Sequence, residues 1–314
     1  MATTGNLRGN RHRHLIFCAL AILLGLSLSR AQAAAGDTSH THLIAHWTFD
    51  ETSGPTSADT SGNQYHAIQK DLNLNGLERV TGVFGHALHF SGQHALKIAG
   101  KMNLSDLEEI TVSAWVMPVA FTAYNEIFRK EDGDHRLLFS FQHNGSVLSL
   151  GVHVAGRGYQ ELDAPINATG IMDGQWHHVA GVFDGTLMKV YLDGQAIGTL
   201  DIPGRIVTGG RAPAYIGSSG GGGEFFQGAI DDLKIWGRAI KAEQIVASYA
   251  RGLQVTLARV KTQQKQLKRV YVEASTFAET LASTRQNLQP LTLQLTRESG
   301  RDLKTLLLAR FKTQ

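Results

Sequence analysis

Short apolar runs separated by tight-turn pairs constrain the fold of this chain more than any other feature. The turn pairs are Asp132-Gly133, Asn144-Gly145, Asp173-Gly174, Asp184-Gly185 and Asp193-Gly194. Both residues of such a pair tolerate the left-handed backbone that a two-residue hairpin requires. The runs between them are strand-length and rich in β-branched and aromatic residues. Because no amphipathic helical pattern separates the runs, we expect an all-β, antiparallel two-sheet sandwich rather than a parallel α/β sheet.

The run at residues 110–117 shows how side chains divide between two faces. Alternation places Val112, Ala114 and Val116 on one face of the strand and Trp115 on the other. Both faces of such a strand carry bulk, so we expect it to be central in its sheet.

The composition narrows the classes of function. The chain has 314 residues, with 34 glycines against 6 prolines, which suits many strands joined by tight turns. A net charge of +3 is too small to indicate nucleic-acid binding. The single cysteine, Cys18, lies in an apolar run near the N-terminus. If that run is removed, the mature protein has no thiol nucleophile, disulfide or cysteine-based metal site.

The first 33 residues have the three parts of a secretory signal peptide. Arg8, Arg11 and Arg13 form a positive cluster, an uncharged run follows at residues 15–28, and Ala31-Gln32-Ala33 matches a small-x-small cleavage site. The sequence therefore predicts a secreted or extracytoplasmic protein with no membrane span after cleavage. The alternative is an uncleaved segment that stays in the membrane as an anchor.

Five segments, in order along the chain, resemble a known family. They are His46-Trp47-Thr48-Phe49-Asp50-Glu51 with Asp59-Thr60-Ser61-Gly62-Asn63, residues 82–92 (GVFGHALHFSG), the run at 110–118, residues 173–180 (DGQWHHVA) leading to 190–194, and residues 226–236 (FQGAIDDLKIW). Together they resemble the laminin-G-like, or concanavalin A-like, jelly-roll domains.

That resemblance implies a jelly roll over residues 40–240 in which the first and last strands lie side by side. It also implies a non-catalytic binding module for a carbohydrate or protein ligand. The fold itself hosts lectins, peptide binders and enzymes, so it indicates function only weakly. A polysaccharide-active enzyme is the less favoured alternative, because the sequence has no Glu-x-Asp-x-x-Glu run of the kind that such glucanases carry on one strand.

Members of this family often hold a calcium ion at an edge of the sandwich. Calcium is bound by about six to eight oxygens from carboxylates, carbonyls and water. The candidate ligands are Asp50, Asp59, Asn63, Asp231 and Asp232. If the first and last strands pair, these distant side chains converge on one structural Ca²⁺ site. Two plainer interpretations stay open: the Asp59 segment is only a turn, and one of the paired aspartates faces water.

Aromatic side chains near predicted loops are the candidate ligand contacts. They are Tyr124, Tyr159, Phe225 and Phe226. Aromatic rings provide apolar platforms with a defined geometry, which suits sugar rings. Alternation lets only one of the two adjacent phenylalanines enter the core, so the other would be exposed.

From Leu253 the composition changes and predicts a helical extension over residues 241–314. Leu253, Val260, Leu267, Ala274, Leu281, Leu288 and Leu295 recur every seven residues. We expect a short helix at 242–250, a long heptad-patterned helix ended or kinked by Pro290, and a second short helix at 302–312. The extension folds back on the sandwich, self-associates through residues 253–289 in an assembly role, or acts as a basic arm.

Overall fold

The computed structural model describes residues 42–70, 77–132, 135–207 and 212–311. The predicted signal peptide lies outside these residues. Within the described part of the chain, none of the helices combines the length and the apolar character needed to cross a membrane.

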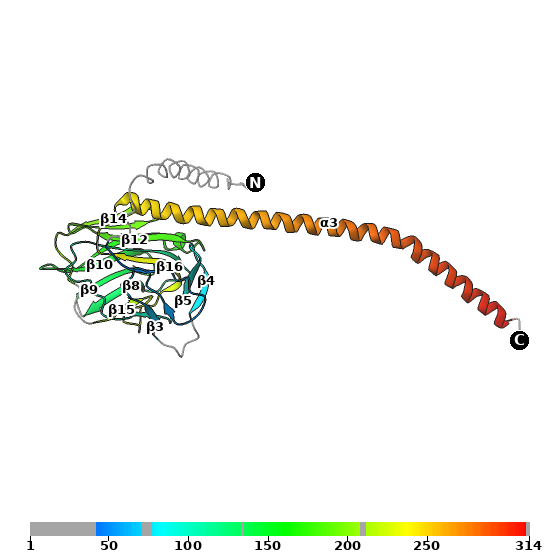
Figure 1. The fold of residues 1–314 in the computed structure, drawn as a ribbon, viewed down its shortest axis with the longest axis horizontal. Helices are drawn as coiled ribbons and strands as arrows, with labels where there is room; N and C mark the ends of the chain where they lie inside the picture. Colours follow the sequence, from blue (N-terminus) through cyan, green and yellow to red (C-terminus); the bar gives the residue numbers. More distant parts are fainter. Residues whose placement is uncertain (1–41, 71–76, 133–134, 208–211, 312–314) are drawn as a thin grey trace, which may run out of the picture. The chain divides into compact units, whose positions relative to one another are not determined.

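Two eight-stranded antiparallel sheets stack face to face and form the predicted sandwich (Figure 1). The first sheet runs in the order β14 (Gln195–Asp201), β13 (Leu187–Leu192), β12 (His177–Phe183), β7 (Ile110–Pro118), β16 (Gln227–Trp236), β5 (His86–Ser91) and β4 (Glu78–Thr81), and β1 (Leu43–Trp47) also pairs with β16. The second runs in the order β11 (Gly158–Pro165), β10 (Val147–Val154), β9 (His135–Gln142), β8 (Tyr124–Asp132), β15 (Ala214–Ile216), β6 (Leu96–Ile98), β3 (Ala67–Gln69) and β2 (Thr56–Ser57).

Asn144-Gly145 and Asp193-Gly194 make hairpins for the predicted reason, whereas Asp173-Gly174 lies between β11 and β12, which belong to different sheets. Asn144 and Gly145 connect β9 to β10 with φ angles of 58° and 77°. Asp193 and Gly194 connect β13 to β14 with φ angles of 51° and 77°. Left-handed backbone at both turn residues matches the twist of the two strands that they join.

The core fills the space between the two sheets. Val112, Ala114 and Val116 are buried in it, and β7 is central as predicted, with β12 and β16 as its neighbours. Phe226, which precedes β16, packs edge-on against Phe90 of β5 at 6.2 Å between ring centroids. It also contacts Phe141 of β9 in the other sheet at 6.4 Å, so aromatic rings join the two layers.

The first and last strands of the sandwich are neighbours, as the resemblance implied. β1 pairs with β16 in antiparallel register, with Trp47 opposite Leu233. Phe49 and Ile235 are both fully buried in the main core. A four-residue helix, α2 (Ala168–Ile171), is the only other helix among the described residues of the sandwich besides the start of α3.

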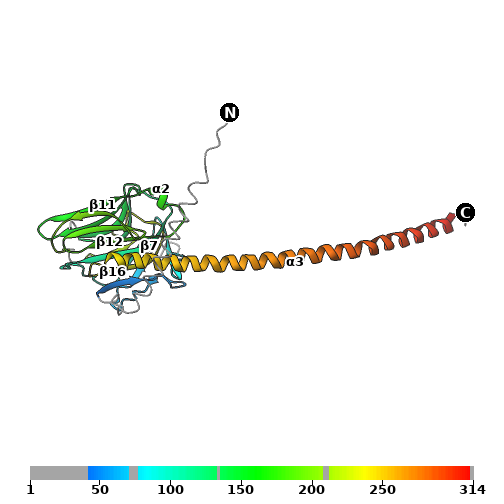
Figure 2. The same cartoon turned by 90° about the horizontal axis from the view of Figure 1, so that it is seen from above.

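α3 (Ala242–Phe311) begins on the outer face of the first sheet. Its residues 242–255 belong to the same compact unit as the sandwich, and Figure 2 shows the start of α3 passing over β7 and β16. Ile245 packs in a small apolar cluster with Trp236 and Tyr191, and Tyr249 stacks on Trp115. This segment of the predicted extension therefore folds back on the sandwich.

The second unit, residues 256–314, continues the same helix. The structure shows one continuous helix, so α3 does not end at Pro290. The two separate short helices predicted at 242–250 and 302–312 are wrong, because residues 242–250 and 302–311 are both part of α3. A proline removes one backbone hydrogen bond and clashes with one carbonyl. The helix-forming glutamines and leucines on both sides outweigh that local cost.

Candidate functional site

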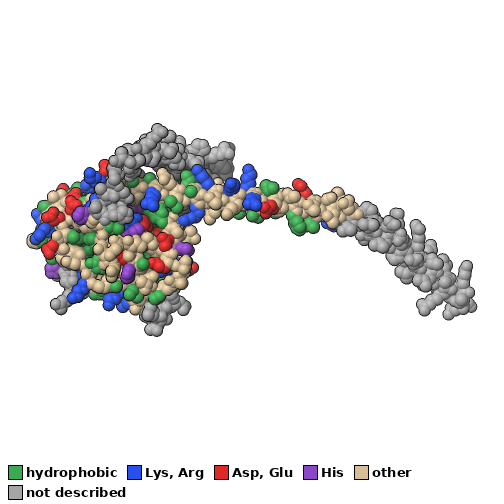
Figure 3. All heavy atoms as spheres, in the orientation of Figure 1, with side chains coloured by type: hydrophobic (Ala, Val, Ile, Leu, Met, Phe, Trp, Pro, Cys, Tyr) green, Lys and Arg blue, Asp and Glu red, His purple; other side chains and the backbone are tan. Residues whose placement is uncertain are grey.

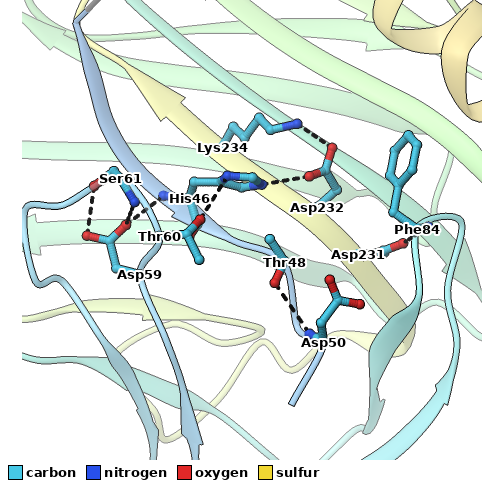
Figure 4. Close-up of polar contacts among 10 residues, drawn as sticks. All are labelled: His46, Thr48, Asp50, Asp59, Thr60, Ser61, Phe84, Asp231, Asp232 and Lys234. Atoms are coloured by element: carbon cyan, nitrogen blue, oxygen red, sulfur yellow. Dashed lines mark hydrogen bonds and ion pairs between the residues drawn. The ribbon is translucent and has the colours of Figure 1, made fainter. Parts of the chain in front are cut away.

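Strand β16 changes its neighbour midway, and the two adjacent aspartates lie at the change. Its residues 227–230 pair with β5, and its residues 233–236 pair with β1. Between these segments the register with β7 shifts, and Asp232 adopts a left-handed φ of 51°. This bulge sends the side chains of Asp231 and Asp232 in different directions (Figure 4).

Asp231 is a fully buried carboxyl group, and only one of its two oxygens accepts a hydrogen bond from the turn before β5. Its Oδ2 accepts a hydrogen bond from the backbone N–H of Phe84 at 2.9 Å. Its Oδ1 is buried and has no hydrogen-bond partner among the described residues. Burial raises the pKa of Asp231 to about 8, against the backbone N–H groups of Phe84 and Val83, and the nearby carboxylates of Asp232 and Asp50 add to the rise.

Asp50 holds the same turn from its other end. Its Oδ1 accepts a hydrogen bond from the backbone N–H of His86 at 2.8 Å. The two carboxylates fit closely against glycines: a Cβ on Gly82 would lie 2.6 Å from Asp231 Oδ2, and one on Gly85 would lie 2.0 Å from Asp50 Oδ1. The residue before Asp50, Phe49, has a left-handed φ of 57°, which is a rare conformation for an aromatic residue.

Asp232 is held by His46 and Lys234 instead. Its Oδ1 lies 2.7 Å from Nε2 of His46, and its Oδ2 forms an ion pair with Lys234. Burial raises the pKa of Asp232, but Lys234 and His46 outweigh burial and hold the pKa below its usual value. The Asp232 carboxylate therefore already has a counter-charge in Lys234.

Asp59 and Asn63 organise a turn. Asp59 accepts backbone hydrogen bonds from His46, Ser61 and Tyr65, each at 2.9 Å. The Asn63 side-chain amide donates to the carbonyl of Ile44 at 2.9 Å. These contacts match the plainer interpretation of the segment, in which an aspartate caps its own backbone.

The five predicted metal ligands are thus not brought together. Figure 4 shows Asp59 and Ser61 on one side of His46, and Asp50 and Asp231 on the other. The described residues contain no group of three or more histidine, cysteine, aspartate or glutamate side chains arranged to hold a metal ion. Only Asp50 and Asp231 face a common turn, and the orphaned Oδ1 of Asp231 makes this pair the part of the predicted site that fits a cation. The calcium ion itself stays a prediction.

A second polar cluster lies on the outer face of the second sheet, and Tyr159 of β11 is part of it. A Cβ on Gly151 of β10 would lie 2.1 Å from the Tyr159 hydroxyl oxygen, so the phenol lies directly over the glycine. The guanidinium carbon of Arg136, on β9, lies 4.6 Å from the centre of the same ring. Glycine at position 151 thereby lets an aromatic ring lie across the sheet.

Acidic and amide side chains surround this tyrosine. Glu161, also on β11, pairs with the Gln142 side-chain amide of β9. Ser149 of β10 donates to Asp163 at 2.6 Å. Burial raises the pKa of Glu161 even though the Tyr159 hydroxyl and the Gln142 amide oppose the rise. Burial also raises the pKa of Tyr159, and the Glu161 carboxylate reinforces that shift.

Glu126 of β8 completes the cluster as a buried acid. It is 0% exposed, and its Oε1 lies 2.6 Å from Nη1 of Arg129, which also pairs with Glu224. Its Oε2 is buried and has no hydrogen-bond partner among the described residues. Burial raises the pKa of Glu126 well above its usual value, and Arg129 only partly offsets the effect. Glu224, which pairs with Arg129, itself has a left-handed φ of 53°.

Sequence reasoning found only Tyr159 in this cluster. The other members could have been found from strand alternation, which separates the outward residues Arg136, Ser140 and Gln142 of β9 from the buried Leu137, Phe139 and Phe141. Two of the remaining predicted ligand residues border the cluster, because Tyr124 lies opposite Gln142 in the β8–β9 pair and Phe225 follows Glu224. Tyr124 is exposed at the start of β8 and Phe225 is half-buried, whereas Phe226 is fully buried in the core and cannot contact a ligand.

A family model described as the concanavalin A-like lectin/glucanases superfamily matches residues 90–246 of the chain. The chain belongs to this superfamily. The match covers β7 to β16, and hence both candidate ligand-facing strands β8 and β11.

Solved concanavalin A-like domains show the same fold at low identity. Domain 4 of an extracellular arabinanase from Geobacillus stearothermophilus, solved in complex with arabinotriose, is 23% identical with a TM-score of 0.52, and the match covers 66% of this chain and 98% of that domain. The binding domain of botulinum neurotoxin DC, solved in complex with SialylT, is 12% identical with a TM-score of 0.52 over 68% of this chain and 52% of that one.

The binding domain of paraclostridial mosquitocidal protein 1 is 13% identical with a TM-score of 0.51, over 67% of this chain and 52% of that one. The chain thus spans about half the length of these two toxin binding domains. At these identities the matches show that the chain shares the fold of these domains.

Proposed function

We propose that this protein is an exported, non-catalytic binding module for carbohydrate, and that its ligand face is the outer face of the second sheet around Tyr159. The observation that carries the proposal is the half-buried Tyr159, which lies across Gly151 with the accessible polar side chains of Glu161 and Asp163 on the same strand. Carboxylates beside an aromatic ring can accept hydrogen bonds from sugar hydroxyls.

The chemistry of the cluster suits a sugar. Tyr159 offers an aromatic surface, while Gln142, Glu161 and Asp163 offer acceptors and donors on one side of the sheet. Binding sites combine a mainly apolar surface with a few placed polar groups that fix the orientation of the ligand. The arabinotriose-bound arabinanase domain shares this fold, which supports a carbohydrate ligand over a protein.

Export is the second part of the proposal. It rests on the cationic cluster, the apolar run and the small-x-small site within the first 33 residues. A sandwich without internal cysteines is compatible with an oxidising compartment, because a domain of this size builds its stability from its core.

A structural calcium ion is the third part. Asp50 and Asp231 would hold it beside the turn before β5, and an ion bound there would neutralise two carboxylates that now face the same backbone. Its role would be to fix this turn, and no step of ligand recognition is assigned to it.

A glycan array probed with the full chain tests the proposal. We expect binding to a defined set of oligosaccharides that Tyr159→Ala abolishes, while Ile68→Ala keeps it, because Ile68 is exposed on β3, three strands away from β8. Circular dichroism would show that both variants fold. Loss of binding in the Ile68 variant alone, or no binding to any glycan, would contradict the assignment of this face.

A further inference from the structure

The described part of α3 beyond Val255 carries an apolar stripe that no described residue covers. Leu267 is 69% exposed, Tyr271 is 73% exposed and Phe277 is 64% exposed. The stripe comprises Leu257, Val260, Leu267, Val270, Tyr271, Ala274, Phe277, Ala278 and Leu281, and we name it the α3 seam. Figure 3 shows hydrophobic side chains on the surface of this part of the helix. A helix in water gains most of its stability from packing such a face against something else.

The repeat length of the seam indicates what covers it. Val260, Leu267, Ala274 and Leu281 recur every seven residues, in continuation from Leu253. On a straight helix a seven-residue repeat drifts by about 20° per heptad, so the stripe winds around the helix axis. A flat surface such as a membrane would lose contact with it, whereas a second helix that supercoils follows it.

The charges of this region leave the seam free to pair with itself. Lys261, Lys265, Lys268 and Arg269 lie on the face of the helix opposite the seam, since each residue turns the helix by about 100°. The positions that flank the seam between 264 and 273 are Gln264, Gln266 and Glu273. Glu273 is already paired with Arg269 of its own helix at 3.4 Å. Two copies therefore meet without opposing like charges.

We propose that the α3 seam binds the same seam of a second copy of this chain as a coiled coil. The large side chains at Leu267, Val270 and Phe277 fill its centre, and the small Ala274 lets the two helices approach. Two linked modules bind a repeating ligand more tightly than one, because the second contact forms at a high effective concentration. That last consequence rests on the proposed carbohydrate function, but the pairing does not.

Sedimentation equilibrium of the full chain tests the proposal. We expect twice the monomer mass, falling by half in the double variant Leu267→Asn/Leu281→Asn. The matched control Lys261→Gln/Lys268→Gln changes the opposite face and should stay at twice the mass. Because every variant keeps the apolar leader, the difference between the two double variants isolates the seam.

Two further measurements test the pairing of the helices independently of the molecular mass. An in-register pair should form an interchain disulfide in Leu267→Cys on a Cys18→Ser background. Monomeric wild-type protein over a wide concentration range, or helix-dependent binding to phosphatidylserine vesicles that is lost in the Lys261→Gln/Lys268→Gln variant, would overturn the proposal. The affinity of each glycan site should be the same in the Leu267→Asn/Leu281→Asn variant as in the wild type. The pairing of the helices and the ligand assignment can therefore fail independently of each other.

Discussion

The indole of Trp115 stacks on the phenol ring of Tyr249, with ring centroids 5.9 Å apart and an angle of 25° between the planes. This contact joins the central strand β7 to the start of α3. His178 packs edge-on against the same indole at 5.2 Å, so Trp115 lies between a buried histidine and the helix. Trp115 thus links the stability of β7 to that of the start of α3.

Gly252 allows the helix backbone to approach Trp115. A Cβ at this position would lie 2.0 Å from Trp115 Cζ2, so Gly252→Ala should displace the start of α3. Overpacking of this kind costs about 1–3 kcal/mol, which exceeds the ~1 kcal/mol that alanine gains over glycine in a helix. Urea unfolding should show a net loss of stability. Gly222→Ala, which meets open space, is the control and should leave the midpoint unchanged.

A side chain at position 85 should be unfavourable, because its Cβ would lie 2.0 Å from Asp50 Oδ1. Gly100 is the matched control, since it also has a positive φ, 73°, but meets nothing within 4 Å. We expect Gly85→Ala to lower the free energy of unfolding by about 1–3 kcal/mol more than Gly100→Ala does. Equal losses in the two variants would show that backbone strain, and not the contact with Asp50, decides the effect.

Calcium should raise the thermal stability of the protein, and a chelator should lower it. A ligand at a hundred times its dissociation constant stabilises a folded protein by about 2.7 kcal/mol. Asp231→Asn should abolish this response, whereas Asp59→Asn should destabilise the turn at residues 59–63 and retain the response to calcium. Differential scanning fluorimetry with and without EDTA checks both, and a retained shift in the Asp231 variant would refute the site.

His178 should make the sandwich sensitive to acid. Burial lowers the pKa of His178 to about 4, and the nearby Lys234 adds to the shift. Between the unfolded value of about 6.5 and this folded value, the unfolded chain binds a proton that the folded chain does not. The contribution of His178 to the free energy of unfolding should therefore fall by up to ~1.4 kcal/mol for each pH unit below 6.5, and it adds to the opposite contribution of Asp231, whose folded pKa is raised. His178→Phe should remove that slope in urea titrations between pH 4.5 and 7.

The neighbouring His177 provides a control of opposite sign. Burial lowers the pKa of His177, but the carboxylates of Asp193 and Asp173 outweigh burial and raise it overall. Its contribution to stability is present below the unfolded pKa and is lost as the pH rises through the folded one. His177→Gln should therefore lower stability in mild acid and leave the slope caused by His178 in place.

The fold could be predicted because local patterns determine it. Alternation around Trp115 placed the strand correctly, and turn pairs such as Asp193-Gly194 marked the hairpins. The candidate cation site could be predicted only in part. The change of partner along β16 separates Asp231 from Asp232, and it depends on where β5 ends and β1 begins, which one sequence does not reveal. The buried acid Glu126 was missed because a lone glutamate in a strand pattern gives no sign that its face is covered.

The pairing of β1 with β16 has a consequence for synthesis. The earliest strand of the sandwich finds its neighbour only after residue 236 has been made, so the hydrophobic interior cannot close while most of the polypeptide is still emerging from the ribosome. Such a late-closing topology leaves the nascent chain without a closed core until the last strand of the sandwich has been made.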